Sequence, residues 1–120
     1  MHTIAIVGQI LIGLFFISMG IHNLRSHNYL MDTLIKKKIF IPKSIFFLAI
    51  GLEILGGGCL ILNFIPAVSA IYLSAFTAIV TYLLHPFWTV KEVERKKHHL
   101  LICLNHIGII GGLFLIISLH

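Results

Sequence analysis

The sequence has few charged residues for its length. Of its 120 residues, 11% are Asp, Glu, Lys or Arg and 58% are hydrophobic, and the mean hydropathy is +1.03. A soluble domain has about 25% charged residues, because it must cover its surface with polar groups. This composition excludes a soluble globular domain. Lipid must be part of the solvent, and we expect an integral membrane protein.

Cysteine is also scarce, and common catalytic motifs are missing. Cys59 and Cys103 both fall in apolar stretches, so we interpret them as small packing residues rather than a disulfide pair. The sequence contains no nucleotide-binding loop, no CxxC redox motif and no nucleophile–base pair of recognisable spacing. These absences leave no motif from which a self-contained enzyme can be argued.

Four long apolar stretches make up most of the chain. A helix needs roughly 20 apolar residues to span the hydrocarbon, where no water can satisfy a bare backbone. The stretches that qualify are 3–24, 44–64, 67–85 and 99–119. They predict an all-α, antiparallel four-helix bundle that forms a single transmembrane domain over residues 1–120. The N-terminus lacks the basic region of a secretory signal, so we expect a retained first span.

Basic residues are confined to two of the three connections. All nine Lys and Arg side chains lie between the first and second stretches or between the third and fourth. The positive-inside rule therefore predicts that both connections are cytoplasmic and both termini lie outside. Anionic lipid headgroups account for the basic pI of about 9.5 without nucleic acid. Within the first connection, the spacing of Tyr29, Leu30, Thr33 and Leu34 predicts a short interfacial helix.

The polar residues of the spans gather in one half of the membrane. Alternating topology places Glu53 about 13 Å inside the cytoplasmic end of its span, level with polar groups at the same ends of the other spans. The candidates for ligand binding or proton relay are Glu53, His85, His106, Arg25, His22 and Asn105. Gln9 alone among the strongly polar groups falls in the other half. We therefore predict a polar chamber that opens towards the cytoplasm.

Glu53 is the most informative of these residues. A carboxylate at that depth costs roughly 3 kcal/mol and usually marks a functional site. It must be neutral, or paired with Arg25 or a protonated His22, His85 or His106. The alternative is a structural polar knot that fixes the register of the helices, and both interpretations stay open. The adjacent Gly56 and Gly57 suit close helix packing.

Metal and haem sites are disfavoured. His99, Cys103 and His106 share one helical stripe and have suitable ligand types for a metal, but their spacing matches no tight metal motif. A haem would need two axial histidines at matching depth, such as His106 with His22 or His85. We assign no metal, and the cofactor stays unknown apart from the quinone considered below.

Several segments resemble the DoxX family of small bacterial membrane proteins with four spans. The segments are GLFFISMGIHNLRS, IFIPKSIFFLAIGLEILGGGCLIL, SAFTAIVTYLLHPFW and LNHIGIIGGLFL. The resemblance implies a membrane subunit associated with oxidoreductases, similar to a small subunit of thiosulfate:quinone and quinol oxidase complexes. It further implies a bacterial inner membrane location. Family-pattern positions in this sequence are Arg25, Glu53, Gly56, Gly57 and His85.

Two functions follow as expectations. The first is an accessory subunit of a quinone or thiol/sulfur redox system, in which Glu53, His85 and His106 contact a quinone or relay protons. The second is a four-helix membrane protein that binds a small molecule or lipid without redox activity. Beyond the lipid bilayer, the expected partners are redox-enzyme subunits or further copies of the chain.

Overall fold

The computed structural model describes residues 3–120. Its helices are α1 (Thr3–Arg25), α2 (His27–Lys36), α3 (Lys43–Ile61), α4 (Pro66–Leu84), the short 3-10 helix η1 (Phe87–Thr89) and α5 (Val93–Leu119). Within residues 3–120 the structure has no strand. The prediction of an all-α fold is therefore confirmed, and the predicted short helix between the first two spans is present as α2.

Four of the helices are long and apolar enough to cross a membrane: α1, α3, α4 and α5. The shortest of them have 19 residues, which at 1.5 Å per residue is about 28 Å, close to the thickness of the hydrocarbon. Large apolar side chains cover their outer surfaces; Leu55 is 62% exposed and Leu115 is 68% exposed. Such a surface requires lipid contact, and the chain is a multi-pass membrane protein.

The helix ends differ from the predicted spans by more than one residue at two places. Helix α3 ends at Ile61, before the predicted end at residue 64, because Asn63 adopts a left-handed conformation (φ 56°) that turns the chain. Helix α5 begins at Val93, ahead of the predicted start at residue 99, because the charged residues before the apolar stretch continue the same helix. Pro66 lies in the first turn of α4, where its missing N–H leaves no helical bond unmade.

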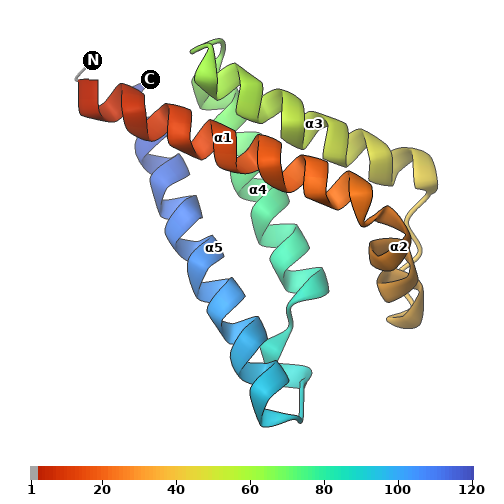
Figure 1. The fold of residues 1–120 in the computed structure, drawn as a ribbon. Coiled ribbons are helices and arrows are strands. Elements are labelled where there is room, and N and C mark those ends of the chain that lie inside the picture. The colour runs from red at the N-terminus through yellow and green to blue at the C-terminus, as the bar shows by residue number, and fades with distance from the viewer. Residues whose placement is uncertain (1–2) are drawn as a thin grey trace.

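The four spanning helices form two pairs. Helix α1 packs along α3, and α4 packs along α5 (Figure 1). The pairs meet near the two chain termini and diverge towards α2 and η1, so the bundle has a closed end and an open end (Figure 1). The largest fully buried core side chains are Phe16, Leu60, Leu73 and Leu113, which come from all four spanning helices.

A hydrogen-bond network around Gln9 joins three helices at the closed end. Gln9 is 4% exposed. Its Nε2 donates to the carbonyl of Leu60 (2.8 Å) and to Oδ1 of Asn63 (3.0 Å), both at the end of α3. Its Oε1 lies 3.1 Å from Nε2 of His120, which directly follows α5. Because such bonds contribute about 1 kcal/mol each in a membrane, we assign Gln9 a structural role.

Two glycines bring the backbones of α1 and α3 into direct contact. A Cβ atom on Gly13 would lie 2.6 Å from the carbonyl oxygen of Gly57, and a Cβ on Gly57 would lie 2.6 Å from that of Gly13. No side chain fits at either position without moving one helix away from the other. This is the small-residue contact that the glycines after Glu53 suggested.

Helix α2 connects the two pairs at the open end. Its Leu34 is 4% exposed, and Lys37, directly after the helix, donates a hydrogen bond from Nζ to the carbonyl of Leu83 near the end of α4 (2.9 Å). That carbonyl belongs to the last turn of α4, where no backbone N–H of the helix can reach it. The bond links the α1–α3 side of the molecule to the α4–α5 side.

The glycine contact predicts a position-specific loss of stability. Replacing Gly57 by Ala should destabilise the purified protein by about 1–3 kcal/mol, because the added methyl group pushes α1 away from α3. Gly58 is the matched control, since a Cβ there meets nothing within 4 Å. Thermal unfolding in detergent should show a lower Tm for Gly57→Ala than for Gly58→Ala, and equal values would contradict the contact.

Candidate functional site

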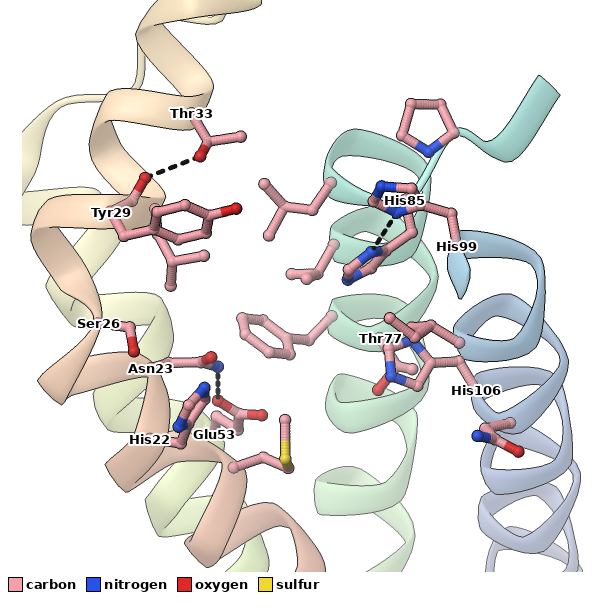
Figure 2. A pocket seen from close by; sticks show the side chains of 18 of the residues that line it. His22, Asn23, Ser26, Tyr29, Thr33, Glu53, Thr77, His85, His99 and His106 are labelled. Carbon is pink, nitrogen blue, oxygen red and sulfur yellow. Dashed lines mark hydrogen bonds between the residues drawn. The ribbon is translucent and has the colours of Figure 1, made fainter. Parts of the chain in front are cut away.

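A cavity of about 520 Å³ lies between the two helix pairs. Its volume is within the range of small-molecule sites, roughly 300–1,000 Å³. Every helix contributes to its lining, and Figure 2 shows part of the lining from close by. The polar lining residues are His22, Asn23, Ser26, Tyr29, Thr33, Lys37, Glu53, Thr77, His85, Thr89, Arg95, His99, Asn105 and His106. Aromatic and aliphatic side chains such as Phe76 and Ile109 complete the lining.

The first wall of the cavity centres on Glu53. This residue is 3% exposed and its Oε1 accepts a hydrogen bond from Nδ2 of Asn23 on α1 (3.1 Å) (Figure 2). Gly20 on α1 lies beside this carboxyl group, and a Cβ there would clash with the side chain of the neighbouring Ile54 while meeting Oε1 of Glu53 at an ordinary 3.5 Å. The hydrogen-bond partner of Glu53 is thus a neutral amide, which satisfies one oxygen without cancelling a charge.

Helical spacing explains why Glu53 points to this position. Gly56 and Gly57 follow it by three and four residues and therefore share its side of α3. Gly57 contacts α1, and Gly56 contacts Leu73 of α4. The same two contacts that hold α3 in place therefore carry the carboxyl group into the space between α1 and α4.

The second wall carries a pair of hydrogen-bonded histidines. Nδ1 of His85, directly after α4, lies 3.0 Å from Nδ1 of His99 on α5 (Figure 2). One ring must donate and the other accept, and a doubly protonated imidazole has no acceptor. At most one of these two histidines can therefore be charged while the bond exists. The thiol of Cys103 donates to the carbonyl of His85 (3.2 Å) and fixes the end of α4 against α5.

His106 extends this wall deeper into the membrane. Its Nδ1 lies 2.6 Å from Oγ1 of Thr81, and that hydroxyl donates to the carbonyl of Thr77 (2.6 Å). A hydroxyl has one proton, so with this bond made, His106 must donate from Nδ1 to Thr81. A neutral His106 then has its acceptor lone pair on Nε2. The ring centroids of His106 and His85 are 6.1 Å apart.

The three residues that were weighed and disfavoured as metal ligands are His99, Cys103 and His106. Within residues 3–120, no group of three or more His, Cys, Asp or Glu side chains is placed to hold a metal ion. His99 bonds to His85, Cys103 bonds to a backbone carbonyl, and His106 bonds to Thr81. Although the three residues share one stripe of α5, their polar atoms have separate partners.

Five of the six candidate residues line the cavity: His22, Glu53, His85, Asn105 and His106. The sixth, Arg25, is exposed at the end of α1 and is not part of the lining. The lining instead includes two cations at the open end, Lys37 and Arg95. Partial burial lowers the pKa of the Lys37 ammonium below its ordinary value.

Sequence reasoning did not identify Asn23 or the residues of α2 as part of the site. Asn23 follows His22 at the polar end of the first span, which was a usable signal. Tyr29 and Thr33 are one turn apart and share a face of α2, and that face lines the cavity (Figure 2). The spacing alone could not show which way α2 folds against the bundle.

Comparison with known proteins identifies the family. A family model described as DoxX matches residues 4–86, which include Asn23, Glu53 and His85. Neither the curated proteins nor the solved structures include a significant match to the chain. The matched segment covers well over half of the chain and contains one complete wall of the cavity. The chain belongs to the DoxX family.

Proposed function

We propose that the chain is an accessory subunit of a membrane oxidoreductase and that its cavity binds a quinone headgroup. The observation that carries this proposal is the pair of polar walls, with Glu53 and Asn23 on one side and the histidines on the other (Figure 2). A quinone ring carries its two oxygens on opposite sides, and the two walls offer hydrogen-bonding groups to both. Aromatic and aliphatic side chains between the walls suit the faces of such a ring.

Proton transfer is the task that these residues could perform. A bound quinone would supply two-electron chemistry that is coupled to proton exchange. Glu53 can hold or release a proton beside the cavity, and Asn23 keeps its carboxyl group in place. The hydrogen-bonded pair His85 and His99 lies towards the open end, where His98 is exposed. These histidines provide sites for protons that pass between the cavity and the aqueous side.

The orientation in the membrane belongs to the same proposal. All nine Lys and Arg residues lie at the open end or in its connections, which supports a cytoplasmic open end with both termini outside. In a bacterial inner membrane the cavity would then open to the cytoplasm. A soluble partner enzyme could reach it there and exchange electrons with the bound quinone.

A second function is favoured by the surroundings of Glu53. Its hydrogen-bond partner is an amide, so the carboxylate could instead neutralise a cationic ligand or bind a hydroxylated one. In that case the chain would be a small-molecule or lipid-binding membrane protein without redox activity.

Substitution of Glu53 tests the proposed proton-transfer role. Glu53→Gln keeps the shape of the side chain and an acceptor for Asn23, so the Tm should stay within a few degrees of wild type. Quinol oxidation by membranes that contain the variant should fall about 100-fold or more, as expected when a general acid–base group is lost.

Glu94→Gln is the control, because Glu94 is exposed in the first turn of α5. Its oxidation rate should equal that of wild type. Glu53→Leu should lose the same activity. Unchanged activity in both Glu53 variants would leave this residue only a structural role.

Partner capture separates the two proposed functions. The tagged chain, solubilised in a mild detergent, should co-purify with subunits of an oxidoreductase and with a quinone, both identified by mass spectrometry. Retention of a lipid or an amine without any redox enzyme would contradict the accessory-subunit role and support the second function.

A further inference from the structure

A second, apolar groove of about 290 Å³ lies beside the polar cavity. It is bounded by α2, α3, α4, the segment that joins α2 to α3, and Asn23 of α1. Almost all of its lining is hydrocarbon: Leu30, Leu34, Ile41, Ile45, Phe46, Ala49, Ile50, Ala75, Phe76, Ile79, Val80, Leu83 and Leu84. The two polar residues of the lining, Asn23 and Tyr72, already have partners, since Asn23 donates to Glu53 and Tyr72 donates to the carbonyl of Ala49 (2.9 Å).

The groove adjoins the polar cavity. Five residues line both spaces: Asn23, Leu30, Phe76, Val80 and Leu84. Asn23 belongs to the groove and also holds the carboxyl group of Glu53. The hydrocarbon-lined groove and the polar cavity therefore adjoin each other at these five residues, one of which is the hydrogen-bond partner of Glu53.

The outer side of the groove faces the lipid. Ile45 on α3 and Ile79 on α4 are 52% and 58% exposed. Ala75, which is also on α4, is exposed as well. An apolar space of this kind does not hold water stably. In a bilayer it would be filled by a hydrocarbon chain that approaches from the side.

We propose that this groove holds the hydrocarbon tail of the ligand whose headgroup occupies the polar cavity. The ligand class is then an amphipathic molecule with one long chain, and it enters sideways from the membrane between α3 and α4. This inference rests on the proposed headgroup site. It adds a binding site for the tail of the ligand and a route by which the ligand enters from the bilayer. The shared boundary with the polar cavity distinguishes this occupant from a lipid that merely coats the surface.

Small residues keep the groove open and provide the test. Ala75 lines the groove and is exposed, so Ala75→Phe places a ring in the groove without entering the core. Ala78 lies on the same helix, is also exposed and lines neither space. Ala78→Phe is therefore a control with the same chemical change.

The experiment measures binding of two probes to each purified variant by isothermal titration calorimetry. The probes are 2-methyl-1,4-naphthoquinone and the same ring with a decyl tail. The two variants should bind the tail-less probe alike. The tailed probe should bind at least about tenfold more weakly to Ala75→Phe than to Ala78→Phe, because a tail gains affinity for every buried methylene group. Partitioning of the tailed probe into detergent lowers its apparent affinity equally for both variants, so the ratio of their affinities is unaffected.

Two results would overturn parts of the account separately. If the tailed probe binds both variants equally, the groove holds no tail, while the headgroup site stands. If neither probe binds wild type, the proposal of a quinone headgroup is wrong. Native mass spectrometry of co-purified amphiphiles then tests whether the groove holds the tail of another ligand. Loss of a bound amphiphile in Ala75→Phe but not in Ala78→Phe supports the groove, and identical spectra overturn it.

Discussion

The close contact between Gly13 and Gly57 holds α1 against α3, and the position of Glu53 depends on it. With the two backbones touching, the carboxyl group one turn before Gly57 reaches Asn23 on α1. Such an approach is open only to residues without side chains, and in lipid it is a main source of helix association. The glycines therefore make it possible to bury a costly polar group beside a cavity.

The second helix pair gives the site its other wall. Helices α4 and α5 are bonded to each other through His85, His99, Cys103, Thr81 and His106. The Gln9 network holds the pairs together at the closed end, while α2 and Lys37 link them at the open end. We propose that the ligand headgroup lies in the space between the pairs and that its tail lies in the adjoining groove between α3 and α4.

Sequence reasoning recovered the fold and much of the candidate site because membrane physics is restrictive. Apolar length predicted the four spans, and alternating topology was enough to group Glu53, His85 and His106 at one end. It could not show that Arg25 lies outside the cavity or that Asn23 is the partner of Glu53, since both depend on helix rotation. The helix ends at Ile61 and Val93 were also missed, because hydropathy does not show a turn conformation and because charged residues end an apolar stretch without ending the helix.

The polar cavity lies within an apolar bundle, and we expect it to open to the aqueous phase. Asn105 lines this cavity, whereas its neighbour Leu104 does not and is 54% exposed on the outer surface. In a chain with Cys59 and Cys103 replaced by Ala, the most direct test is the reaction of Asn105→Cys and Leu104→Cys with a membrane-impermeant thiol reagent in inside-out vesicles. Only a hydrated thiol forms the reactive thiolate, so we predict rapid labelling at position 105 and little at 104. Equal labelling at both positions, or none at 105, would contradict the account.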